Sequence, residues 1–208
     1  MQTDQPASGS TGRRVAVIVI VGLATGILTQ FGQSILPDGW SQAANAISPW
    51  LFVAFLVGSR MPDRRWAAGA GIATLLLALV GYYAMTQLRY GIGGSTGTLL
   101  FWGLGAVVGG PVFGIAGLTW RTGRARQRAL AIGLVAAVAI AEGLYHASVL
   151  ERSSEGAGFI IAGLLAPLVL GRSREDRLWG YVAILPALAL GAIGYVVFLG
   201  LYSVFTGV

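Results

Sequence analysis

The sequence contains no cysteine and no lysine, and it has a single histidine, His146. The absence of cysteine excludes disulfides, thiolate metal sites and cysteine nucleophiles. One histidine is too few for bis-histidine haem ligation or for a metal centre built from several imidazoles. A chain without lysine cannot form a retinal Schiff base. We therefore expect neither a bound metal nor a resident cofactor.

Charged residues are also scarce: they make up 11% of the 208 residues, whereas 55% are hydrophobic. A soluble domain carries about 25% charged residues to cover its surface, so much of this chain must face lipid. The net charge of +6 comes from short arginine clusters between apolar runs. Such clusters are typical of topology signals and of contacts with lipid headgroups. We expect the lipid bilayer as a partner, and no nucleic acid.

Seven apolar runs predict the fold class, an all-α integral membrane protein. They cover residues 15–35, 43–59, 66–87, 96–118, 128–148, 156–171 and 179–204. The second and sixth runs are the shortest, so six spans remain an alternative. With seven spans and a cytoplasmic N-terminus, twelve arginines fall in cytoplasmic segments, and only Arg89 and Arg152 lie outside. By the positive-inside rule, this predicts a bundle of seven transmembrane helices with the C-terminus outside.

The polar segment 1–13 is predicted to be a disordered cytoplasmic tail, and residues 14–208 a single transmembrane domain. All fourteen basic residues are arginine, which is typical of a GC-rich bacterial genome. The expected location is the bacterial cytoplasmic membrane, which the chain would cross several times.

Glycines recur at helical spacing inside the predicted spans. Small residues at this spacing let helix backbones approach closely in lipid. The predicted packing residues are Gly22 and Gly26 in the first span and Gly105, Gly109, Gly110, Pro111 and Gly114 in the fourth. Pro111 should also kink its helix. These faces either pack inside the bundle or dock a membrane partner protein.

Glu142 is the one acidic residue well inside an apolar run, and His146 follows it at i+4 on the same helix face. Counted from Arg128, Glu142 lies about 21 Å into a hydrocarbon core of about 30 Å. A carboxylate at this depth is costly and by default marks a functional site. One interpretation is that the pair shares a proton at such a site. The other is a helix-to-helix hydrogen bond, in which case Glu142→Gln should be nearly silent.

Other polar and aromatic side chains fall at a similar depth, in the outer half of the predicted bundle. With Glu142 and His146, the candidate substrate-binding residues are Gln30, Gln33, Tyr82, Tyr83, Trp102, Tyr145 and Tyr195. Interfacial aromatics often form a belt, but a belt does not explain the amides or the carboxylate. Together these residues predict an outward-facing pocket for a small polar solute. Catalysis is not expected, because Glu142 has no second buried carboxylate and no metal or serine motif is present.

Three segments, SPWLFVAFLVG (48–58), LLFWGLGAVVGGPVFGIAG (99–117) and AEGLY (141–145), resemble an uncharacterised family of small polytopic actinobacterial membrane proteins. That family carries no assigned activity. The layout is also similar to the S-subunits of energy-coupling-factor vitamin transporters, which have six spans, an outward pocket and small-residue motifs that dock a transport module. Gly22 and Gly26 would be the matching motif. The sequence thus favours a solute-binding or transport-associated membrane protein; the alternative is a structural or accessory protein.

Overall fold

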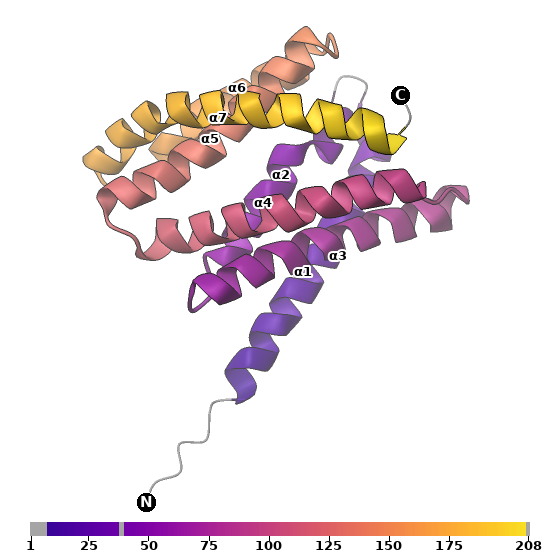
Figure 1. Cartoon of the computed structure of the whole chain (residues 1–208), viewed down its shortest axis with the longest axis horizontal. Helices are drawn as coiled ribbons and strands as arrows, with labels where there is room; N and C mark the ends of the chain where they lie inside the picture. The colour runs from indigo at the N-terminus through magenta and orange to yellow at the C-terminus, as the bar shows by residue number, and fades with distance from the viewer. Residues whose placement is uncertain (1–7, 38–39, 207–208) are drawn as a thin grey trace, which may run out of the picture.

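The computed structural model describes the backbone of residues 8–37 and 40–206, and the side chains of residues 11–37, 40–193 and 200. Within this part of the chain every regular element is helical (Figure 1). The α-helices are α1 (Ser8–Ile35), α2 (Ile47–Gly58), α3 (Arg64–Tyr90), α4 (Thr96–Thr122), α5 (Ala125–Ser148), α6 (Ser153–Leu170) and α7 (Arg174–Thr206), with a short 3-10 helix η1 (Gln42–Asn45) before α2. The predicted all-α class is confirmed. Because α1 begins at Ser8, part of the segment predicted to be a disordered tail is helical.

Among the described residues, six helices are long and apolar enough to cross a membrane, which makes the chain a multi-pass membrane protein. The exception is α2, in the second predicted span. Its 12 residues reach about 18 Å, against a hydrocarbon core of about 30 Å. The chain nevertheless returns through this region, because α1 and α3 run parallel: Gly22 lies against Thr74 and Gly26 against Ala78. The return path combines α2 with η1 and the irregular backbone beside it.

The helices form two groups that lie side by side in Figure 1. In the first group α3 packs between α1 and α4, and α2 contacts both α3 and α4; in the second, α5 packs against α6 and α7. Phe55, Met61 and Ile132 are fully buried between helices. Large apolar side chains such as Val108 and Leu185 remain exposed on the outer faces, as expected for helices solvated by lipid.

Close approach between helices depends on glycine. A Cβ added to Gly26 of α1 would collide with the Ala78 carbonyl oxygen of α3, and one at Gly114 of α4 with Ala67 of α3. Gly22 and Gly110 likewise lie against the α3 backbone, and α4 continues through Pro111 as one helix. Gly109 meets only the Leu51 side chain within 4 Å, and a Cβ at Gly105 would meet no atom within that distance. Gly105 differs from the packing prediction because it lies on an exposed part of α4.

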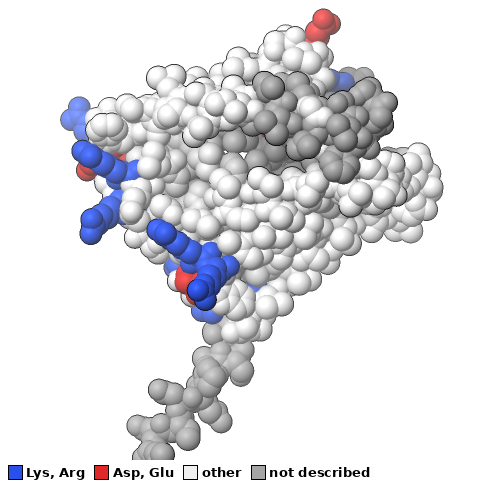
Figure 2. Space-filling model, in the orientation of Figure 1, with Lys and Arg blue, Asp and Glu red and all other residues white. Residues whose placement is uncertain are grey.

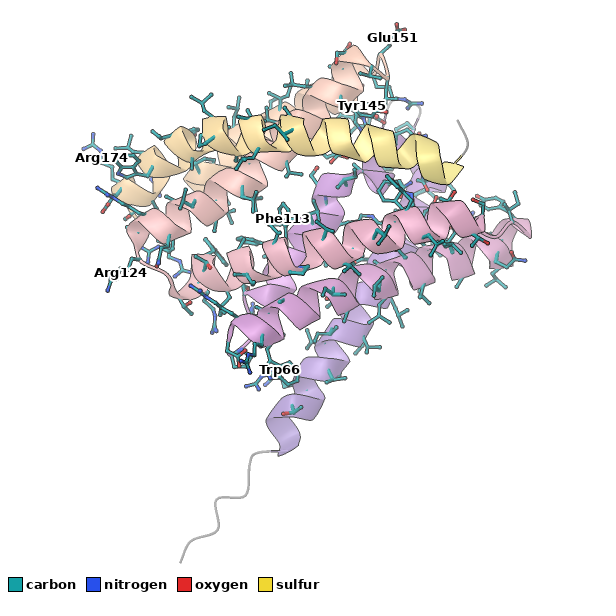
Figure 3. The ribbon with its side chains drawn as sticks, viewed as in Figure 1. Trp66, Phe113, Arg124, Tyr145, Glu151 and Arg174 are labelled. Atoms are coloured by element: carbon teal, nitrogen blue, oxygen red, sulfur yellow. The ribbon has the colours of Figure 1, made fainter. Side chains whose placement is uncertain are left out.

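Arginines gather at one end of the bundle, where the chain joins α2 to α3, α4 to α5 and α6 to α7. We call this the arginine-rich end. Figure 2 shows basic side chains concentrated there, and Figure 3 places Arg124 and Arg174 at this end and Glu151 at the opposite one. Fully buried Asp176 ties two of the connections together: its carboxylate binds the Arg128 side chain at 3.1 Å and accepts bonds from the amides of Arg172 and Ser173.

Candidate functional site

Glu142, on α5, binds the N-terminus of α2. Its Oε1 accepts a hydrogen bond of 2.5 Å from the Ile47 amide, and its Oε2 accepts one of 2.6 Å from the Ser48 amide. The Ser48 hydroxyl also donates to Oε2. The first N–H groups of a helix have no partner within the helix, and a carboxylate there also interacts favourably with the helix dipole. Glu142 thus satisfies the end of a helix that begins at membrane depth.

His146 has a different partner. Its Nδ1 lies 2.8 Å from Oε2 of Glu155, at the start of α6, and the two residues are 4% and 0% exposed. The other oxygen, Oε1, accepts a hydrogen bond of 3.2 Å from the backbone amide of Gln42 and lies 3.6 Å from the Arg152 guanidinium. These hydrogen bonds of Glu142 and His146 thus go to different groups, and proton sharing between the two side chains stays a prediction from the sequence.

The two carboxylates together hold the segment Trp40–Ser48, which contains η1 and the first residues of α2. Glu155 binds its Gln42 amide, and Glu142 binds its last two amides. The Trp40 ring packs at Gly158 of α6, where a Cβ would lie 2.9 Å from it. Irregular backbone is tolerated at membrane depth only where protein or water satisfies its polar groups. Here glutamates from α5 and α6 bind three of the backbone amides, and Trp40, Ala43 and Ala46 donate to backbone carbonyls.

Four of the predicted polar residues lie elsewhere, between α1 and α3. The Tyr82 hydroxyl donates to Gln33 Oε1 at 2.9 Å, and Arg89 donates to Gln30 Oε1 at 3.0 Å. The Tyr83 ring contacts Tyr82 edge-on, with 5.2 Å between centroids. None of these bonds reaches Glu142, although the sequence places these side chains at a depth similar to that of Glu142. The reason is that α2, rather than α1 or α3, faces this part of α5.

The remaining predicted residues have aromatic neighbours or fall outside the described side chains. The Tyr145 ring lies edge-on to His146 at 6.2 Å, and the Trp102 ring edge-on to Phe101 at 5.2 Å. The side chain of Tyr195 lies outside the described residues. The predicted pocket residues thus belong to at least two separate clusters, one around Glu142 and Glu155 and one around Tyr82 and Arg89.

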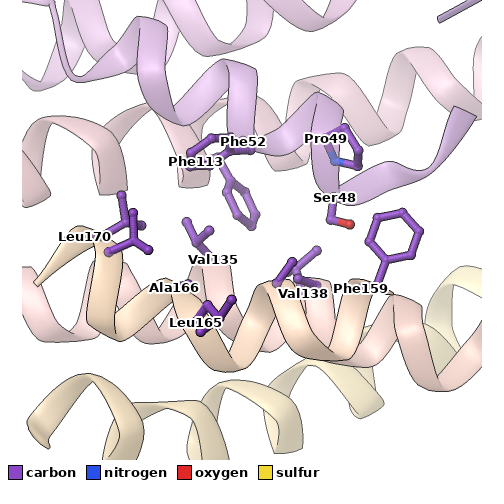
Figure 4. A pocket seen from close by; sticks show the side chains of 13 residues that line it. Ser48, Pro49, Phe52, Phe113, Val135, Val138, Phe159, Leu165, Ala166 and Leu170 are labelled. Carbon is purple, nitrogen blue, oxygen red and sulfur yellow. The ribbon is translucent and has the colours of Figure 1, made fainter. Parts of the chain in front are cut away.

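A cavity of about 440 Å³ lies between α2 and α6, with α4 and α5 completing its wall (Figure 4). Of its thirteen lining residues only Ser48 has a polar side chain, and the Ser48 hydroxyl is bound to Glu142. Ser48 and Phe159 lie at one end of this cleft, and Leu170 lies at the other. Several lining side chains of α6 remain exposed, Leu165 at 46% and Val169 at 77%, so the cleft is open along this helix.

None of the predicted binding residues whose side chains the structure describes lines this cleft. Sequence reasoning missed it because its lining residues, such as Phe52, Phe113 and Leu165, have the same composition as lipid-facing residues. It also missed Glu155, which stands at the edge of an apolar run and is fully buried in the fold. The cleft offers a ligand shape and apolar contact but almost no hydrogen bonding. No cluster of three or more metal-ligating side chains occurs among residues 8–37 and 40–206.

At the Leu170 end the cleft meets the arginine-rich end of the bundle. The Trp120 indole donates a hydrogen bond of 3.0 Å to the Leu170 carbonyl oxygen. The guanidinium of Arg172 stacks 4.9 Å above the Trp120 ring and donates to the Arg121 carbonyl oxygen at 3.1 Å. Packing on an aromatic face and one hydrogen bond thus fix an exposed guanidinium two residues beyond the end of the cleft.

A family model, described as a family of unknown function (DUF6518), matches residues 5–201. The chain belongs to this family. The predicted resemblance to an uncharacterised family is thereby confirmed. No curated protein and no solved structure matches the chain.

Membership of the DUF6518 family brings no assigned activity. The looser similarity to S-subunits depends on Gly22 and Gly26 as a docking face. In this member of the family both glycines lie against α3 within the same chain. That face of α1 is therefore covered by α3 and does not support docking of a transport module.

Proposed function

We propose that the protein binds a small, mainly apolar molecule in the cleft between α2 and α6, as a non-catalytic, multi-pass protein of the bacterial cytoplasmic membrane. The observation that carries this proposal is the cavity of about 440 Å³ with its apolar lining. Small-molecule sites have volumes of about 300–1,000 Å³ and are lined mainly by apolar and aromatic side chains. The three phenylalanines Phe52, Phe113 and Phe159 fit this pattern.

The character of the ligand follows from hydrogen bonding in the wall of the cleft. Ser48 is the one polar side chain there, and its hydroxyl already donates to Glu142. A polar solute would lose its hydration without gaining partners, which is costly. An apolar solute gains about 25 cal/mol per Å² of apolar surface that it removes from water. The outward-facing pocket for a polar solute, expected from the sequence, is thus replaced in this proposal by a membrane-embedded cleft for an apolar one.

A role associated with transport is part of the same proposal. In many transporters the binding site is formed where a membrane helix is broken near mid-depth. Here α2 begins beside the cleft: Glu142 binds the first two backbone amides of α2, and Glu155 binds the Gln42 backbone amide in the segment before it. We propose that the segment Trp40–Ser48 closes this end of the cleft.

The proposed orientation has the arginine-rich end in the cytoplasm and the C-terminus outside. Two observations support it. Arginines concentrate at that end, as the positive-inside rule requires. The two arginines at the opposite end both have partners within the chain: Arg89 binds Gln30 and Ser34, and Arg152 lies beside Glu155.

The test uses two adjacent leucines of α6. Leu165 lines the cleft and Leu164 does not, yet their exposed fractions are 46% and 47%. Purified protein in detergent is irradiated with a photoreactive fatty acid at low mole fraction, and labelled residues are mapped by mass spectrometry. We expect labelling of the cleft side of α6, its loss in Leu165→Trp and its retention in Leu164→Trp. Equal labelling of both variants would refute the proposal.

A further inference from the structure

We propose that the occupant of the cleft is an acyl chain of an anionic phospholipid whose phosphate is bound by Arg172 at the arginine-rich end. This inference rests on the proposed function and names its ligand class. The cleft supplies one half of the recognition, since it takes an apolar chain and offers it no polar partner. The other half is the fixed guanidinium at the Leu170 end of the cleft.

Three contacts hold the Arg172 guanidinium near the Leu170 end of the cleft: one joins Trp120 to Leu170, and two join Arg172 to Trp120 and to Arg121. Leu170 lines the cleft, and its carbonyl oxygen accepts the Trp120 indole N–H. The Trp120 ring carries the Arg172 guanidinium, which also donates to the Arg121 carbonyl oxygen. A guanidinium has five N–H donors in a planar fork that matches a phosphate group, so one hydrogen bond to a carbonyl leaves a fork for the ligand. A guanidinium held in place also loses less entropy on binding than a free one.

The local charge favours an anion. Arg121 and Arg174 are both exposed: the Arg121 carbonyl oxygen accepts a hydrogen bond from the Arg172 guanidinium, and Arg174 follows Arg172 two residues later in the chain. Of the two acidic residues in the first turn of α7, Asp176 is buried and bound to Arg128, whereas Glu175 is exposed. The cations therefore outnumber the one free carboxylate. Each basic residue near a membrane surface contributes about 1 kcal/mol to the attraction of anionic lipid.

The combination selects a phospholipid among possible occupants. A free phosphate would satisfy Arg172 but leave the cleft empty, and a neutral lipid would fill the cleft without using the guanidinium. An anionic phospholipid does both, and the membrane that solvates the helices supplies it directly. Its headgroup would lie at the arginine-rich end and its chain would run along α6 toward Ser48.

The test compares two lipids that differ only in the headgroup. The full-length protein, in mixed micelles, is irradiated with phosphatidylglycerol or phosphatidylcholine carrying the same photoreactive acyl chain at the same low mole fraction. Crosslinks to peptides of α6 are quantified by mass spectrometry. We expect more labelling from phosphatidylglycerol, and a reduction of about fivefold in Arg172→Gln, which corresponds to the loss of one cation at the surface.

Arg126→Gln is the matched control, because Arg126 is also exposed and packs on a tryptophan, Trp179, but neither residue lines the cleft or contacts Leu170 in the way that Trp120 does. It should leave the labelling unchanged. An equal loss in both arginine variants would mean general charge attraction and would overturn the inference, as would equal labelling by both lipids. A photoreactive fatty acid that labels as strongly, with the same dependence on Arg172, would also overturn it in favour of a free fatty acid.

Leu165→Trp separates this inference from the proposed function. If that variant loses the labelling by both lipids while Arg172→Gln loses nothing, the cleft binds apolar chains without recognising a headgroup. The proposed function then stands and the phospholipid inference fails. If Leu165→Trp labels as the unmodified protein does, both fail.

Discussion

The imidazole Nδ1 of His146 lies 2.8 Å from Oε2 of Glu155, and neither residue is more than 4% exposed. The pair joins the end of α5 to the start of α6 across a four-residue connection. Phe159 packs beside the imidazole, with 5.3 Å between ring centroids, and also lines the cleft. The second oxygen of Glu155 binds the Gln42 amide. One buried contact therefore links α5, α6, η1 and the wall of the cleft.

The first prediction concerns this pair. His146→Phe leaves the Glu155 carboxyl buried without its strongest partner, and we expect the protein to lose about 3 kcal/mol of stability. The double variant His146→Phe with Glu155→Leu should lose less than His146→Phe alone, because no unpaired carboxyl remains. Thermal denaturation in detergent measures both. A double variant less stable than the single one would show that Glu155 acts through Gln42 and Arg152 rather than through His146.

The second prediction is that Glu142→Gln destabilises the protein by about 2 kcal/mol. Both carboxylate oxygens accept bonds from backbone amides, so the amide group of glutamine would set its own N–H₂ against an N–H of α2. The sequence-based expectation of a nearly silent change under a structural role does not hold with this geometry. Glu151→Gln, in the exposed connection before α6, is the control and should change nothing. An unchanged melting temperature for Glu142→Gln would contradict the capping role.

The third prediction compares two glycines in helices. Gly26→Ala should separate α1 from α3 and cost at least about 3 kcal/mol, because the new methyl would collide with the Ala78 carbonyl. At Gly69 of α3 an added Cβ meets no atom within 4 Å. Alanine there should be neutral or stabilise the helix by up to about 1 kcal/mol. Melting temperatures in one detergent test the pair, and similar losses at both sites would disprove the close α1–α3 contact.

The fourth prediction concerns orientation, and the absence of cysteine makes single-cysteine labelling clean. A membrane-impermeant maleimide applied to intact cells should label Glu151→Cys, and should label Arg124→Cys only after permeabilisation. A reporter active only in the cytoplasm and fused after Val208 should give no signal. The reverse labelling pattern would place the arginine-rich end outside, against the positive-inside rule.

Much of the fold could be predicted from the sequence because lipid imposes long apolar runs and arginine clusters at their ends. Six of the seven predicted spans correspond to helices long enough to cross. The second run contains an α-helix of 12 residues, because the chain between Trp40 and Ala46 forms turns and the 3-10 helix η1, with the Gln42 backbone amide bound to Glu155 of α6, instead of extending α2. Hydropathy depends only on composition, so it cannot distinguish a full-length helix from a short helix preceded by a 3-10 turn.

The site was harder to predict than the fold, because its contacts depend on backbone groups and on which helices face each other. Glu142 stood out because a carboxylate inside an apolar run is expensive, and it does have partners on another helix. Its partners are mainly backbone N–H groups, which every residue except proline carries, so no residue type pointed to Ile47. Depth along the membrane placed Tyr82 and Gln33 at a level similar to that of Glu142. It gave no information on which helices face each other, and α1 and α3 form their own cluster.

The contact between Glu142 and α2 has a consequence for biosynthesis. The Ile47 amide and its acceptor are 95 residues apart in the chain. At about 5–20 residues per second, α5 leaves the ribosome on the order of 5 to 20 s after α2. Throughout that interval the first turn of α2 lacks its acceptor and can be satisfied only by water or by the translocation machinery. We therefore expect the second apolar run to reach its final structure only after α5 has been inserted. In a nascent chain that stops after α4, the first turn of α2 would still lack its acceptor.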